Sequence, residues 1–73
     1  MSTLDKLVRM ANQIASNFEI HGEEEAVLRT SEHIAKYWEP RMKIQLRDYL
    51  IADGKKLEPI AKAAASRALE EAQ

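Results

Sequence analysis

The sequence of 73 residues contains no cysteine. Disulfide bonds, thiolate metal ligands and cysteine nucleophiles are therefore excluded as sources of stability or chemistry. A chain of this length buries only about 60% of its unfolded surface, so its stability depends on a small core or on a partner. The length allows one domain, which we expect to span residues 1–73.

Glycine, long apolar runs and an excess of one charge are also lacking. Two glycines cannot build a glycine-rich phosphate loop. Eleven basic and twelve acidic residues give a net charge of −1, without the positive excess of a nucleic-acid-binding domain. No apolar run is long enough to cross a bilayer, and residues 1–6 do not resemble the start of a signal peptide. We therefore expect a cytoplasmic protein.

The spacing of apolar residues predicts an all-α fold, a small bundle of three to four helices. The first helix covers about residues 3–18. The second opens with glutamates at residues 23–25, whose negative charge suits a helix start. It ends near residues 38–39, because the residue before a proline is pushed out of the helical conformation. Its apolar side is expected to consist of Val27, Thr30, Ser31, Ile34, Tyr37 and Trp38, with His33 at the boundary.

Proline is favoured in the first turn of a helix, where its missing N–H is not needed. A third helix therefore starts at Pro40 and ends before a turn at residues 53–56, where Gly54 suits the position after the helix. Its apolar residues lie on two nearly opposite sides, and Ile44 and Ile51 share the minor side.

The fourth helix carries the smallest side chains. It starts near Glu58, with Pro59 in its first turn. Its predicted apolar stripe consists of Leu57, Ile60, Ala61, Ala64, Ala68 and Ala72. Alanine favours the helix but buries little area, so we expect this helix to fray unless a neighbour or a partner holds it.

Residues suited to chemistry are few and scattered. His21 lies near residues 23–25, but a run of glutamates at a helix start is usually solvated. His33 has no second histidine one turn away, so it either bonds to a neighbour or contacts a partner. None of the serines lies in a recognisable nucleophile motif. A catalytic pair of carboxylates needs burial or a shared cavity, for which a chain this small has little room. The sequence therefore predicts no catalytic residue, no metal ligand, no cofactor and no enzymatic activity.

The segment 33–42 concentrates tryptophan, tyrosine, arginine and methionine, which are enriched in protein interfaces. The single tryptophan of a small helical protein is also a common core anchor, and both roles are open for Trp38. Arg41 has three alternatives. It can pair with Glu39 or Asp48, cap carbonyls at the end of the second helix, or reach a carboxylate of a partner.

Two segments together resemble a known family. They are DKLVRMANQI at residues 5–14 and HIAKYWEPRM at residues 33–42. Both resemble the delta subunit of the soluble NAD-dependent formate dehydrogenases, and residues 57–59 resemble the start of that family's last helix. The chain departs from the family at Tyr37, where phenylalanine is more common, and at residues 16–18, which are less aromatic.

The resemblance implies a small helical accessory subunit without a cofactor. In this family the parent enzyme oxidises formate to carbon dioxide and passes the electrons to NAD. Its large subunits carry the molybdenum or tungsten pterin, the iron–sulfur clusters and the flavin. The delta subunit is linked to assembly or stabilisation of the complex through the catalytic alpha subunit, and its motifs contain no catalytic residue.

We therefore predict a non-catalytic delta subunit that binds the formate dehydrogenase alpha subunit, to stabilise it or to assist cofactor insertion. The predicted partner-binding residues are Arg9, Met10, Asn12, Gln13, His33, Trp38, Pro40, Arg41 and Met42. The alternative is a free-standing helical interaction module, such as a homodimer, that binds nucleic acid or another regulator. Self-association of the isolated chain is open, because Ile44 and Ile51 would leave apolar surface exposed.

Overall fold

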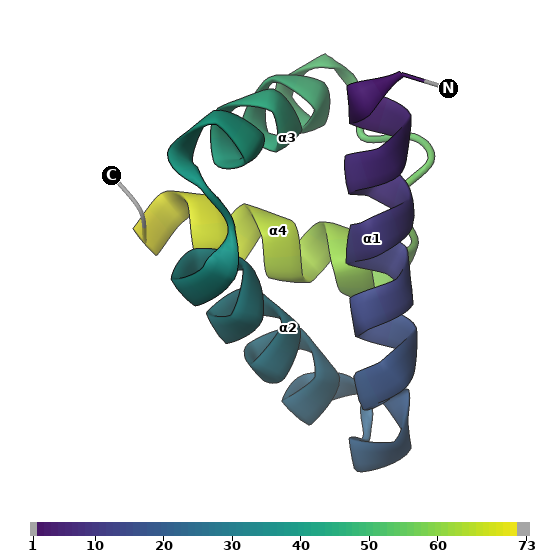
Figure 1. Cartoon of the computed structure of the whole chain (residues 1–73). Coiled ribbons are helices and arrows are strands. Elements are labelled where there is room, and N and C mark those ends of the chain that lie inside the picture. The colour runs from purple at the N-terminus through teal and green to yellow at the C-terminus, as the bar shows by residue number, and fades with distance from the viewer. Residues whose placement is uncertain (1, 72–73) are drawn as a thin grey trace.

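The computed structural model of the protein describes residues 2–71, and the side chains of residues 2–69. In this range the chain forms helices α1 (Thr3–Phe18), α2 (Glu23–Tyr37), α3 (Pro40–Ala52) and α4 (Pro59–Glu71), with a short 3-10 turn, η1 (Glu19–His21). Figure 1 shows α4 in the middle, between α2 and α3, while α1 passes the start of α4. The described residues contain no strand, and the predicted all-α bundle is confirmed.

α1 begins at a capping box, in which a serine and an acidic residue satisfy each other's backbone N–H groups. The Ser2 hydroxyl accepts a hydrogen bond from the Asp5 N–H at 3.1 Å, and the Ser2 N–H donates to the Asp5 carboxylate at 3.4 Å. The hydrogen bonds from Ser2 favour the ionised carboxylate and hold the pKa of Asp5 below its ordinary value.

Removing this cap gives a prediction about acid stability. Ser2→Ala is expected to move the pKa of Asp5 back toward its ordinary value. Because the folded state lowers this pKa, the carboxylate stabilises the wild type above the unfolded-state pKa, and that stabilisation disappears as the pH falls through the folded-state pKa. The variant should therefore melt below the wild type at neutral pH, with a smaller difference in acid. NMR titration of Asp5 checks this, and an unchanged pKa would contradict it.

The connection between α2 and α3 is a sharp corner. Trp38 and Glu39 are both extended, with ψ angles of 137° and 154°, and Pro40 occupies the first turn of α3 as predicted. The Lys43 ammonium donates to the carbonyl of Ala35 at 2.6 Å. A cation therefore holds a carbonyl in the last turn of α2, where the helix dipole favours positive charge.

α3 ends where Gly54 adopts a φ of +60°, a left-handed conformation that glycine adopts without strain. Its N–H donates to the carbonyl of Tyr49 at 3.0 Å. A Cβ added at this glycine would lie 3.2 Å from both the Leu50 and the Lys62 side chains. Both the conformation and the crowding therefore favour glycine at the predicted turn.

The core lies where the four helices meet, and α4 contacts all three other helices. Its members are Leu7, Val8, Ala11, Ala15, Ile34, Trp38, Leu46, Leu57, Ala61, Ala65, Ala68 and Leu69. The stripe predicted for α4 omitted Ala65 and Leu69, and its last member, Ala72, lies outside the described residues. The alanine-rich helix α4 was expected to need a neighbour or a partner, and within the fold it packs against α1, α2 and α3.

α2 and α4 pack against each other through small side chains. Ala61, Ala64 and Ala65 of α4 have no exposed surface. On α2, Ala26 is fully buried, and so is the hydroxyl of Thr30, which has no hydrogen-bond partner among the described residues. Small residues bring helix axes close together, so this crossing gains its stability from close packing more than from large apolar groups.

The prediction that Tyr37 lies on the buried side of α2 is wrong, because its side chain is 64% exposed. The helix ends at this residue, and the extended conformation of Trp38 places the indole, 5% exposed, in the core instead. Ile44 and Ile51 are 50% and 76% exposed, as expected for the minor apolar side of α3. None of the helices in the described range is long and apolar enough to cross a membrane.

Candidate functional site

The residues predicted to bind a partner do not form one surface. In Figure 1, α1 and the connection between α2 and α3 lie on opposite sides of the molecule. The predicted residues divide into an exposed α1 group (Arg9, Met10 and Gln13), an exposed corner group (Pro40 and Arg41), and a partly or fully buried group (Asn12, His33, Trp38 and Met42). A flat partner surface would therefore reach one exposed group or the other, and only a partner that extends around the protein would contact both.

Asn12 fastens the loop between α3 and α4 to α1. Its Nδ2 donates to the carbonyl of Lys56 at 3.1 Å, and its Oδ1 accepts from the N–H of Glu58 at 2.9 Å. One carboxamide thus satisfies the backbone on both sides of Leu57, which is 5% exposed and belongs to the core. The Tyr49 hydroxyl accepts from the Lys56 N–H at 2.7 Å and fixes the same loop from α3. The asparagine of the first motif therefore has a role within the fold.

Removing this carboxamide should loosen the loop. Asn12→Ala is expected to lower the free energy of unfolding by about 1–2 kcal/mol, because it leaves two backbone groups without their partner. Asn12→Asp keeps the acceptor for Glu58 but loses the donor to Lys56, so its loss should also be clear. Urea denaturation measures both effects.

The control for Asn12 lies on the same helix. Asn17 is exposed, and its side chain accepts one hydrogen bond from Gln13 at 3.1 Å. Asn17→Ala should therefore change stability by no more than about 0.5 kcal/mol. Equal losses at the two asparagines would contradict the role assigned to Asn12.

Trp38 and Met42 pack inward from the corner. Trp38 belongs to the buried cluster, and Met42 is half-buried against it. The core alternative for the tryptophan therefore describes its position in this fold. Direct contact of either side chain with a partner stays a prediction.

Arg41 is the exposed cation of the corner. Within the described residues, no hydrogen bond or ion pair holds its guanidinium, so pairing with Glu39 or Asp48 is wrong. The carbonyl-capping role belongs to Lys43, and Asp48 lies 3.8 Å from Arg47 instead. Of the alternatives weighed for Arg41, contact with a partner is the one left to test.

His33 takes part in an aromatic cluster that the sequence prediction missed. Its ring centroid lies 4.9 Å from that of Tyr37, and the Lys36 ammonium lies 5.5 Å from the Tyr37 centroid. These residues line a hollow of about 360 Å³ together with Phe18, Arg29 and Glu32. The four-residue spacing of His33 and Tyr37 is the signal that could have found this cluster, because such residues lie on one helix face.

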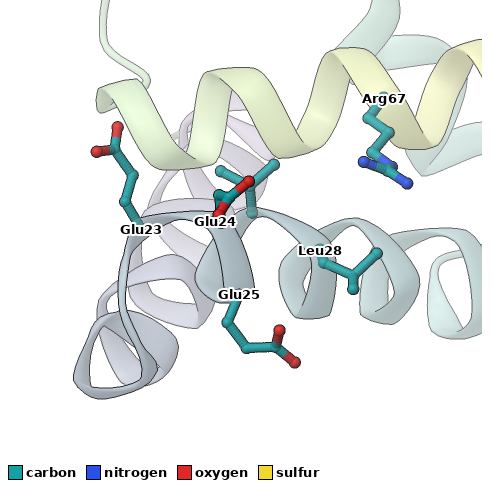
Figure 2. A pocket seen from close by; sticks show the side chains of 6 residues that line it. Glu23, Glu24, Glu25, Leu28 and Arg67 are labelled. Atoms are coloured by element: carbon teal, nitrogen blue, oxygen red, sulfur yellow. The ribbon is translucent and has the colours of Figure 1, made fainter.

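A further hollow, of about 520 Å³, lies between the start of α2 and α4 (Figure 2). It is lined by Glu23, Glu24, Glu25, Val27, Leu28 and Arg67. The side chains of Glu23 and Glu25 point in different directions in Figure 2. Among the described residues, no three His, Asp or Glu side chains come together as a metal-binding group. These carboxylates therefore suit the positive end of the helix dipole more than a bound cation.

The described residues thus form a small all-α protein whose predicted polar residues either fix its own fold, as Asn12 does, or lie exposed on two surfaces. The chain belongs to the NADH-dependent formate dehydrogenase delta subunit family, FdsD, whose family model matches residues 6–65. The resemblance seen in the two sequence segments is therefore confirmed. Comparisons with curated proteins and with solved structures gave no match.

Proposed function

We propose that this delta subunit is a non-catalytic accessory protein that binds the catalytic alpha subunit of a formate dehydrogenase. Bound there, it stabilises the alpha subunit or assists insertion of its cofactor. The observation that supports this most directly is the exposed guanidinium of Arg41 at the Pro40 corner, which no described residue pairs with. Arginine beside apolar and aromatic residues is a typical interface anchor.

The outer side of α3 supports the same proposal. Ile44 and Ile51 lie two helical turns apart and are largely exposed, and Arg47 is exposed between them in sequence. Leaving two large aliphatic side chains in water loses the stabilisation that burial would give. A partner that covers α3 would bury them and pair with Arg41 at the same time.

The test of the function is reconstitution. The large subunits of the formate dehydrogenase are produced with and without this chain, and the recovery of the alpha subunit, its molybdenum or tungsten content and the formate-dependent NAD reduction of the complex are compared. We expect the chain to co-purify with the alpha subunit. Lower recovery of the alpha subunit without the chain indicates stabilisation, whereas lower metal content at equal recovery indicates assisted insertion. Equal recovery, content and activity without co-purification would refute the proposal.

The corner is tested by charge reversal within the reconstituted complex. Arg41→Glu is expected to weaken retention of the alpha subunit about tenfold or more, because a carboxylate would replace the cation that a partner carboxylate meets. Arg29→Glu is the matched control, because Arg29 is an exposed arginine of α2 that pairs with Glu25 and lies outside the corner and α3. Equal retention of the two variants would show that the corner is not the contact.

A further inference from the structure

The outer side of α1 is a second candidate contact, and its charge is one-sided. Residues 6–18 contain no aspartate or glutamate, although the chain has twelve acidic residues in 73. Lys6 and Arg9 are exposed on this side and lie three residues apart, which places them on one face of the helix. With Met10 and Gln13 they line a hollow of about 400 Å³.

A third cation reaches this side from another element. Lys56, in the loop before α4, lines an adjoining hollow of about 310 Å³ with Arg9 and Asp5. Asp5 is the carboxylate that lines this second hollow; it accepts the N–H of Ser2 in the capping box, and its pKa is lowered by hydrogen bonding with Ser2 and, less strongly, by the charge of Lys56. Three cations and one carboxylate therefore line the two hollows. The net charge of this side is positive, whereas the start of α2 carries three glutamates.

Met10 gives the basic side an apolar centre. Its side chain is 43% exposed between the turns that carry Lys6 and Gln13. Methionine is unbranched and polarizable, so it adapts to aliphatic or aromatic groups of a partner. We call Lys6, Arg9, Met10 and Lys56 the α1 basic face.

We propose that the α1 basic face docks an acidic segment of the formate dehydrogenase alpha subunit that carries an exposed large apolar side chain. The segment's carboxylates pair with the three cations, and its apolar group packs on Met10. This inference rests on the proposed function and adds a second contact to the corner at Arg41. A nucleic acid is a poorer fit, because its binding draws affinity from the neutralisation of phosphates, and this face offers three cations in a chain whose net charge is −1.

The test reverses two charges in the full chain and measures the dissociation constant for the alpha subunit at several salt concentrations. Lys6→Glu with Arg9→Glu is expected to weaken binding at least about tenfold and to flatten its salt dependence. The control, Arg29→Glu with Lys36→Glu, changes the net charge equally at two exposed positions of α2 that belong to neither the corner group nor the α1 basic face, and it should keep the wild-type salt dependence. Lys6→Gln with Arg9→Gln is the milder variant and should give an intermediate loss.

The outcomes separate this inference from the proposed function. If the wild-type chain fails to bind the alpha subunit, the proposed function is wrong and the inference falls with it. If the wild type binds and the α1 variants bind equally well, the function stands and the inference is overturned. Equal weakening by the control also overturns it, because the effect then follows net charge. Loss of self-association instead, seen by sedimentation, assigns the face to a second copy and overturns it too. Melting curves verify that each variant is folded.

Discussion

Trp38→Ala is expected to lower the free energy of unfolding by about 3–5 kcal/mol, the range for removing a buried aromatic side chain. The indole is 5% exposed and belongs to a cluster that includes Leu7, Ile34 and Leu46 from three helices. A domain this small has a total stability of only about 5–15 kcal/mol or less, so much of the population should lose its fold. Urea denaturation followed by circular dichroism measures the change.

The neighbouring residue provides the control. Tyr37 is also aromatic but is 64% exposed, so Tyr37→Ala should change stability by less than about 1 kcal/mol. If the two variants unfold at the same urea concentration, the indole does not anchor the core. Trp38→Phe separates folding from binding, because it keeps an aromatic ring in the core. Loss of alpha-subunit binding in a folded Trp38→Phe chain would support the predicted contact.

The helix boundaries could be predicted because local signals mark them. Ser2 caps the start of α1, Pro40 and Pro59 begin α3 and α4, and Gly54 ends α3. Each signal acts through the backbone of a few adjacent residues, so no tertiary information is needed. The length and type of the elements follow from these signals together with the apolar spacing.

The side-chain environments at the corner could not be predicted in the same way. Tyr37 and Trp38 are adjacent, and helical spacing assigns both to the buried side of α2. α2 ends at Tyr37, and the backbone of Trp38 is extended, so the side chain of Trp38 and not that of Tyr37 lies in the core. Periodicity cannot predict which of two adjacent aromatics lies beyond the last helical turn, because the choice depends on how α3 leaves the corner.

The roles of the candidate site residues were also hard to predict from the sequence, because some of their contacts join residues that are far apart in it. In the sequence, Asn12 and Arg41 are polar residues beside apolar ones. This pattern fits both a hydrogen bond within the fold and a contact with a partner. The partners of Asn12 lie 44 and 46 positions away in the sequence, so only the folded chain reveals that this carboxamide is engaged. The guanidinium of Arg41 has no partner among the described residues, and its contact with another protein stays a prediction.

The central position of α4 leads to the second large effect. Ala64→Leu is expected to lower the free energy of unfolding by about 2–3 kcal/mol or more, because overpacking a filled interior forces side chains and backbone to shift. Ala64 has no exposed surface, and the α2 residues Ala26 and Thr30 are fully buried as well. Three further carbon atoms at this position would therefore have to displace neighbouring atoms or push α2 and α4 apart.

Ala63→Leu is the matched control, one residue away on the exposed side of α4. Leucine and alanine both favour helices, so this control should change stability by no more than about 0.5 kcal/mol. Thermal and urea unfolding of the two variants measure the difference. If Ala64→Leu is as stable as Ala63→Leu, the α2–α4 crossing is loosely packed, and α4 would then depend on a partner for its position. A clear loss of stability at Ala64 alone would mean that the alanines at this crossing stabilise the fold by letting the two helices approach closely. This contribution could not be predicted from the sequence, because each alanine buries only a small area.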